Sequence, residues 1–230
     1  MSKQESTVIP IHLRYGAAFL IKGRGAVLVD CGNPGESELI LHTLSRHGVK
    51  PDQLSLLLVT HGHLDHYGSA RELKESTGVK VAVHRLDANA VRRGANAPLC
   101  ATGIGGRVAQ FVVDRDGGVP EIALEPDLLL HGETSLVPYG VCGRVIETPG
   151  HTSGSVSVLL PGGEAIVGDL LVGRLFRRRI YDQLLSIDKG KIRRSIRKVL
   201  DAGAKKIFAS HGGPYKAEAV ERILARSESK

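Results

Sequence analysis

The chain has 230 residues, of which 42% are hydrophobic and 24% are charged, as in an ordinary globular protein with a substantial core. No apolar run approaches the roughly 18 residues of a membrane-spanning helix, and Met1 to Tyr15 lacks the pattern of a signal peptide. Cys31, Cys100 and Cys142 are odd in number and far apart, which argues against a disulfide framework. We therefore expect a cytoplasmic protein with no membrane partner.

The net charge of +7 and the pI near 9.5 leave two interpretations open. The positive charge suits an anionic substrate or nucleic acid, or it is only a solvated basic surface. Aromatic residues make up 4% of the chain, which leaves few rings on which bases could stack. A small-molecule substrate is therefore expected and nucleic acid is not. The oligomeric state stays open, a homo-oligomer included.

The first half of the chain reads as short strands, a helix and then a buried strand. The predicted strands cover 8–13, 17–21, 26–30, 54–60 and 79–84, and the predicted helices cover 37–47 and 68–76. Gly48 and Gly78 are natural helix ends. Residues 54–60 are almost continuously apolar, which is typical of a strand buried on both faces.

Directly after this buried strand, the stretch 60–66 reads Thr-His-Gly-His-Leu-Asp-His. Open α/β sheets build their sites beyond the carboxyl ends of strands. In a turn, His61 and His63 can point to one side while Asp65 and His66 point to another, which would serve two metal ions. Imidazole and carboxylate ligands suit zinc, iron or manganese.

The second half returns to strands and ends on helices. Strands are predicted over 141–147, 155–160, 164–169 and 206–210, and helices over 86–93, 188–202 and 216–226. Asp188 is the expected N-cap of its helix, and Pro161-Gly162-Gly163 is the expected hairpin turn. Because we find no repeats and no low-complexity linker, we expect one domain over 1–230.

The pattern His61-x-His63-x-Asp65-His66 resembles the signature of the metallo-β-lactamase-fold superfamily. That signature continues with a distant histidine, an aspartate and a final histidine. The chain offers a match for each of these, placed after predicted strands: His151, Asp169 and His211. The resemblance covers about residues 8–215 and implies an α+β fold, the four-layer αββα sandwich. Periodicity alone indicates only mixed α and β.

The resemblance also implies a role for each residue. The implied ligands are His61, His63 and His151 for one metal ion, Asp65, His66 and His211 for a second, and Asp169 as a bridge, with Asp65 and Asp169 catalytic. Asp30 matches an early aspartate that supports the ligands from behind. We expect two divalent ions, zinc or else iron or manganese. A shared hydroxide, formed because metal lowers the pKa of water towards about 7, would attack an ester, thioester or lactone carbonyl.

Several alternatives stay open. Hydroxyacylglutathione hydrolases share this ligand set but add a C-terminal helical region, and only residues 212–230 follow the last ligand here. Quorum-quenching lactonases resemble the chain too, but their tyrosine three positions after the bridging aspartate is Val172 here. Tyr67, Tyr181 and Tyr215 are the phenols that we consider in its place. A phosphodiesterase, a mono-iron persulfide dioxygenase and a non-catalytic basic binding module are the other candidates.

Two further segments are assigned to the substrate. The candidate contacts after Asp169 are Arg174, Arg177, Arg178, Arg179 and Tyr181. Arginines there would bind a phosphate or carboxylate group, and a solvated charge run is the alternative. Residues 86–115 fall where members of the family place substrate-covering segments, so we expect them to cover the metal site and set specificity.

Overall fold

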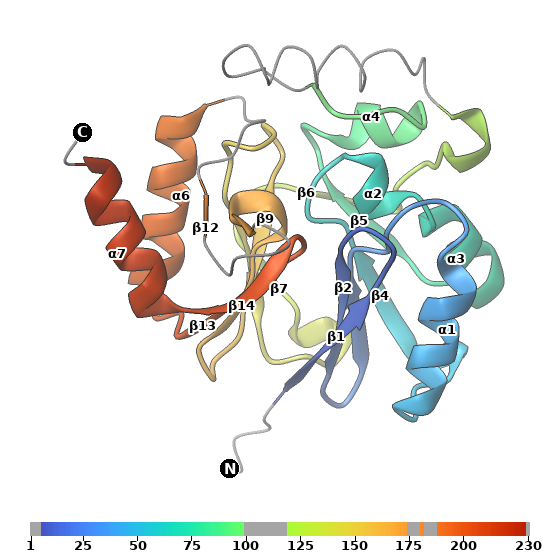
Figure 1. Ribbon diagram of the computed structural model, residues 1–230. Helices are drawn as coiled ribbons and strands as arrows, with labels where there is room; N and C mark the ends of the chain where they lie inside the picture. The colour runs from blue at the N-terminus through green and yellow to red at the C-terminus, as the bar shows by residue number, and fades with distance from the viewer. Residues whose placement is uncertain (1–5, 99–118, 174–179, 182–187, 229–230) are drawn as a thin grey trace.

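The structure is a computed structural model that describes residues 6–98, 119–173, 180–181 and 188–228. Two six-stranded sheets lie face to face, and helices cover the outer face of each (Figure 1). This is the α+β, four-layer αββα architecture predicted from the sequence. None of the described helices is both long and apolar enough to cross a membrane.

The first sheet has the strand order β1-β2-β3-β4-β5-β6. Its strands are β1 (Thr7–His12), β2 (Ala17–Lys22), β3 (Ala26–Val29), β4 (Leu54–Leu58), β5 (Val81–His84) and β6 (Leu128–Leu130). The first three strands, which the sequence predicts, form an antiparallel meander, and β3 to β6 run parallel. The helices on this side are α1 (Ser37–Arg46), α2 (Leu64–Tyr67), α3 (Ala70–Thr77) and α4 (Ala88–Arg92). In Figure 1, α1 and α3 flank the sheet and α4 lies above it.

The second sheet has the order β14-β13-β10-β9-β8-β7. Its strands are β7 (Thr134–Ser135), β8 (Arg144–Glu147), β9 (Val156–Leu159), β10 (Glu164–Ile166), β13 (Lys206–Ala209) and β14 (Gly212–Lys216). The outer helices are α6 (Lys189–Asp201) and α7 (Ala217–Glu228), and β11 (Val172–Gly173) pairs with β12 (Ile180–Tyr181) in a separate hairpin. The Asp188 carboxylate accepts a bond of 2.9 Å from Lys191 N, so the predicted N-cap is confirmed.

Both faces of the central strands are buried, which explains their continuous apolar sequence. In β2, Leu20 belongs to the core beneath α1 and α3, while its neighbour Phe19 belongs to the core between the sheets. The Phe19 ring meets Phe208 of β13 edge to face, with centroids 5.7 Å apart. Alternation along a strand therefore divides one apolar run between two cores.

The structure differs from the predicted elements mainly where elements are short. The predicted helix over 68–76 is α3, and it ends at Gly78 in the left-handed conformation (φ 72°). The strands β6, β7 and β14 and the one-turn helix α2 were not predicted, because they are too short or too rich in glycine and proline to carry a period. Strand β10 ends at Ile166, so Asp169 lies in a 3₁₀ turn after it and not in the strand itself.

Candidate metal centre

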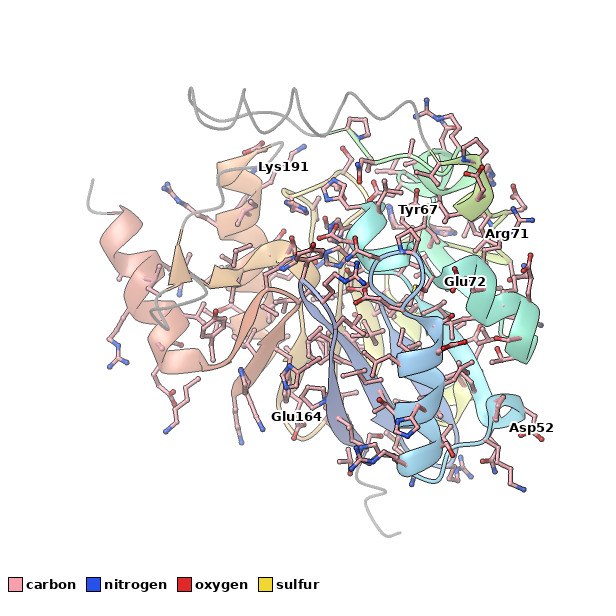
Figure 2. All side chains as sticks on the ribbon, turned by 45° about the vertical axis from the view of Figure 1, so that its right-hand side comes forward. Asp52, Tyr67, Arg71, Glu72, Glu164 and Lys191 are labelled. Carbon is pink, nitrogen blue, oxygen red and sulfur yellow. The ribbon has the colours of Figure 1, made fainter. Side chains whose placement is uncertain are left out.

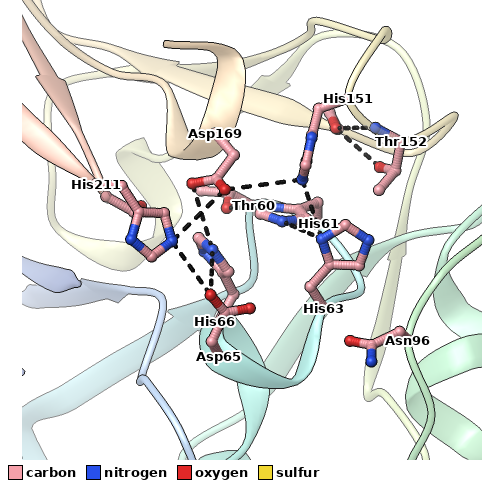
Figure 3. A network of polar contacts seen from close by, with 12 residues as sticks. Thr60, His61, His63, Asp65, His66, Asn96, His151, Thr152, Asp169 and His211 are labelled. Atoms are coloured by element: carbon pink, nitrogen blue, oxygen red, sulfur yellow. Dashed lines mark hydrogen bonds and ion pairs between the residues drawn. The ribbon is translucent and has the colours of Figure 1, made fainter. Parts of the chain in front are cut away.

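All the predicted metal ligands meet at one end of the two sheets (Figure 3). His61 and His63 follow β4, and Asp65 and His66 lie in α2. The second sheet contributes His151 from the β8–β9 loop, Asp169 from the turn after β10 and His211 from the β13–β14 turn. Each residue follows the end of a strand, as the sequence predicts.

The first ligand group consists of His61, His63 and His151. The Nδ1 atom of His63 lies 3.0 Å from His61 Nε2 and 3.0 Å from His151 Nε2. All three side chains are buried. Nitrogen ligands about 2.0–2.1 Å from a tetrahedral ion lie about 3.3 Å from one another. The three nitrogens thus stand close to the arrangement that such an ion requires.

The second ligand group consists of Asp65, His66 and His211. The Oδ2 atom of Asp65 lies 3.1 Å from His211 Nε2 and 3.7 Å from His66 Nε2. Asp169 lies between the two groups: its Oδ1 is 3.4 Å from His66 Nε2, and its Oδ2 is 3.6 Å from His211 Nε2 and 3.8 Å from His151 Nε2. Its carboxylate can therefore reach a cation in either group.

Asp30 supports one histidine of each group. Its Oδ2 accepts a bond of 2.8 Å from His66 Nδ1 and another of 2.8 Å from the Thr60 hydroxyl. Because that hydroxyl donates to Asp30, its oxygen accepts from His61 Nδ1 at 3.1 Å. Both imidazoles therefore present Nε2 to the centre. The Asp30 backbone has φ 60°, a conformation that aspartate tolerates better than most residues, and it turns the carboxylate under the motif.

His211 is oriented by a backbone group. Its Nδ1 donates to the Tyr15 carbonyl at 2.9 Å, in the loop between β1 and β2. That loop is held in turn by the buried Glu36 carboxylate, which accepts from Arg14 N at 2.6 Å. A carbonyl acceptor leaves no signal in the sequence, so this support was not predicted.

The residues fit a bound metal ion. Two buried atoms in the centre, His66 Nε2 and Asp169 Oδ1, have no hydrogen-bond partner among the described residues, although they lie 3.4 Å apart. Unpaired buried polar atoms are costly, and a divalent cation would engage both. A set of imidazole nitrogens and carboxylate oxygens matches zinc, iron or manganese.

In the metal-free centre, the pKa is lowered for two of the histidines and raised for two others. Burial lowers the pKa of His61 and His63, and the neighbouring imidazoles lower it further. Burial also opposes the charged form of His66 and His211, but the surrounding carboxylates outweigh it and raise the pKa to about 10 and about 9 respectively. Despite its burial, Asp65 has a pKa well below its usual range because His66 and His211 lie beside it.

These shifts predict that the metal-free protein is most stable near pH 6.5. Raised histidine pKa values stabilise the fold below about pH 6.5, and this contribution is lost as the pH rises towards 9–10. The lowered pKa values of His61 and His63 have the opposite effect on stability: they destabilise the fold as the pH falls below about 6.5. Urea unfolding of chelator-treated protein from pH 5 to 10 measures the profile. Stability that keeps rising up to pH 9 would contradict the prediction.

The remaining predicted site residues have mixed outcomes. Arg174, Arg177, Arg178 and Arg179 lie outside the described residues, and Tyr181 is placed only as the backbone partner of Val172.

Among the other phenols, Tyr67 is buried and donates to the Ala95 carbonyl at 2.7 Å, away from the centre (Figure 2). The hydroxyl of Tyr215 is buried beside Gly173 and Gly212. Of the predicted covering segment, Asn96 accepts from Leu64 N at 2.9 Å, so its described part touches the ligand motif.

One buried carboxylate beside the centre was missed. Asp87 follows β5 and accepts hydrogen bonds from the loops that carry the first ligand group. The sequence did hold a signal for it: Asp87 follows the predicted strand 79–84, and site residues gather at the carboxyl ends of parallel strands.

Comparison with known proteins places the chain in a family. The family model described as "Metallo-beta-lactamase superfamily" matches residues 13–211. A hydroxyacylglutathione hydrolase from Ectopseudomonas mendocina is 33% identical over 149 residues, which cover 62% of this chain and 55% of that protein. The chain thus spans about half the length of that relative. Metallo-beta-lactamase domain-containing protein 1 from Xenopus laevis is 29% identical over 209 residues, 87% of this chain and 72% of that protein.

The fold agrees with solved structures. The crystal structure of BLEG-1 B3 metallo-beta-lactamase superposes with a TM-score of 0.71 at 22% identity, and covers 95% of this chain and 97% of that one. The family model spans every residue of both ligand groups, from His61 to His211. The chain therefore belongs to the metallo-β-lactamase superfamily.

Proposed function

We propose that this protein hydrolyses an ester, thioester or lactone in a centre that holds two divalent metal ions, with zinc as the first candidate. The observation that carries the proposal is the position of Asp169, whose carboxylate lies within 3.8 Å of histidines from both ligand groups. One ion would be held by His61, His63 and His151, and the other by Asp65, His66 and His211.

Bound metal would supply a water that loses its proton near neutral pH and would polarise the bond to be cleaved. The protein's own part is to orient these groups. In the metal-free protein His66 and His211 lower the pKa of Asp65, and a bound cation would take the place of the protons that these two histidines hold. Asp65 and Asp169 would then orient the attacking water towards the substrate. Asp30 and the Tyr15 carbonyl would keep the imidazoles turned with Nε2 inwards.

A carbonyl substrate is favoured over a phosphodiester by the likeness to a hydroxyacylglutathione hydrolase, whose substrate is a thioester. Residues 99–115 of the predicted covering segment lie outside the described residues. We propose that its described part, 86–98, lies beside the substrate site, because Asn96 and Ala97 bind the backbone of the ligand motif. The basic segment after Asp169 remains the proposed contact for an anionic group on the substrate.

The test is a hydrolysis assay with metal-loaded protein, a chelator control and four substrates: an aryl ester, an acyl lactone, a glutathione thioester and an aryl phosphodiester. We expect turnover of a carbonyl substrate that stops on chelation and returns with metal. His61→Ala should abolish it, whereas His42→Ala, which removes an exposed histidine of α1, should not.

Activity that survives chelation or His61→Ala would refute the proposal. Turnover of the phosphodiester alone would assign the arginines to phosphate binding. If the iron-loaded protein turned over none of the four substrates, the result would favour a persulfide dioxygenase.

A further inference from the structure

Asp87 begins α4, yet its carboxylate does not cap that helix. An aspartate at a helix start ordinarily accepts from the backbone of its own first turn. The Asp87 side chain forms no such bond. Its Oδ2 accepts from Gly62 N at 2.9 Å and from the Thr152 hydroxyl at 2.6 Å, and its Oδ1 accepts from Gly154 N at 2.9 Å. All three of these hydrogen bonds join the Asp87 carboxylate to other parts of the chain.

The three donors belong to the two loops that carry the first ligand group. Gly62 stands between His61 and His63, and Thr152 directly follows His151. These loops come from different sheets, since one follows β4 and the other joins β8 to β9. One carboxylate therefore bridges the two halves of this ligand group at a point next to each half.

The contact is also close in a steric sense. A Cβ atom on Gly154 would lie 2.6 Å from Asp87 Cγ, and a Cβ atom on Gly62 would lie 3.1 Å from Asp87 Cβ. A side chain at position 154 would therefore displace Asp87, and one at position 62 would be a tight fit. A displacement of the carboxylate is therefore transmitted directly to the backbone beside each ligand.

The charge of Asp87 has no ordinary partner. Its exposed fraction is 2%, and no cationic side chain of the described segments forms an ion pair with it. Buried carboxylates are normally paired with a cation or coordinate one. The adjacent ligand group is made of three imidazoles, which carry no negative charge of their own. A negative charge beside that group favours the binding of a cation to it.

We propose that Asp87 is a positioning residue that sets the geometry and the metal affinity of the first ligand group. The inference rests on the proposed metal centre. It predicts an asymmetry, because Asp87 bonds to loops of the first group and to no residue of the second. Loss of its carboxylate should weaken one metal ion far more than the other.

The test is titration of metal-free protein with Co²⁺, followed by visible absorption and by competition with a chromophoric chelator. Asp87→Asn keeps the shape but turns an N–H₂ group towards at least one of the three donors. We expect affinity for one Co²⁺ ion to fall about 10–100-fold, with an altered absorption band, while the other ion binds as in the unchanged protein. This spectroscopic readout does not depend on catalytic activity.

Asp127→Asn is the matched control. Asp127 accepts from Val81 N at 2.8 Å and from Lys74 Nζ at 2.7 Å, so it also joins distant segments but contacts no ligand loop. This variant should lose some stability and keep both Co²⁺ affinities.

If Asp87→Asn does not fold, a second pair of variants tests the same contact. Thr152→Val removes the hydroxyl donor with little change in shape, and Thr152→Ser keeps it. We expect Thr152→Val to bind one Co²⁺ ion more weakly and Thr152→Ser to bind it as tightly as the unchanged protein.

A folded Asp87→Asn protein with unchanged Co²⁺ affinity and spectrum would overturn the inference. An equal loss for both ions would overturn it too, since that is the result of general loosening. Failure of the proposed centre gives a different result: His61→Ala would then bind both Co²⁺ ions as tightly as the unchanged protein.

Discussion

Replacing Asp169 by alanine is expected to lower kcat/KM by ~10³ or more, a loss of about 4 kcal/mol in transition-state stabilisation. The physical reason is the position of its carboxylate between the two ligand groups, within 3.8 Å of His66, His151 and His211. Without it, the centre loses the carboxylate that would hold both cations together and, with Asp65, orient the attacking water. Steady-state kinetics with metal analysis of the same samples measures the effect.

The fold should survive this change. One oxygen of Asp169 has no hydrogen-bond partner among the described residues, so truncation leaves few donors unpaired. Circular dichroism of the metal-free variant checks this. Asp52→Ala is the control, because Asp52 lies exposed on the 3₁₀ turn before β4, at the opposite end of the strand from the motif (Figure 2). Turnover within about 3-fold of the unchanged enzyme after loss of Asp169 would refute its assigned role.

Asp30→Asn is expected to weaken the binding of both metal ions by about 10–100-fold. Asp30 Oδ2 accepts from the Thr60 hydroxyl and from His66 Nδ1, and Oδ1 accepts from Thr60 N at 2.7 Å, so the N–H₂ group of asparagine must face a donor in either orientation. At the Oδ2 position it removes the acceptor of His66 and of the Thr60 hydroxyl that orients His61, and at the Oδ1 position it removes the acceptor of the Thr60 backbone next to His61. The free energy of unfolding of the metal-free protein should also fall, by about 1–3 kcal/mol, because a buried donor is left unpaired.

Two measurements separate these effects. Chelator competition gives the metal affinities, and urea unfolding gives the stability. Glu72→Gln makes the same chemical change where, among the described residues, the carboxylate accepts from Ser37 alone, between α3 and α1, and it should leave metal binding unchanged (Figure 2). If Asp30→Asn weakened the binding of only one metal ion, Asp30 would support a single histidine. That result would contradict the expectation that Asp30 supports both His66 and, through Thr60, His61.

The residues of the candidate metal centre could be predicted from the sequence because four of them lie close together in the chain. These four occupy residues 61–66, and the other three follow predicted strands. The carboxyl ends of neighbouring strands meet at one edge, so chain order and strand order suffice to bring these residues together. The long central strands and the helices over 37–47 and 188–202 were predicted for a similar reason, since their hydrophobic patterns repeat over several turns or residues.

The tertiary structure alone decided how the ligands are held. The Tyr15 carbonyl contacts His211, the Asp87 carboxylate contacts the His151 loop, and Asp30 fixes the Thr60 hydroxyl. These contacts join segments far apart in the chain, and no local pattern records them. The short strands β6, β7 and β14 likewise form only because a neighbouring strand supplies their hydrogen bonds. Residue identity and order therefore determined which atoms meet at the centre. Packing of the two sheets determined how these atoms are oriented, because their orientation depends on contacts that form only when the chain folds.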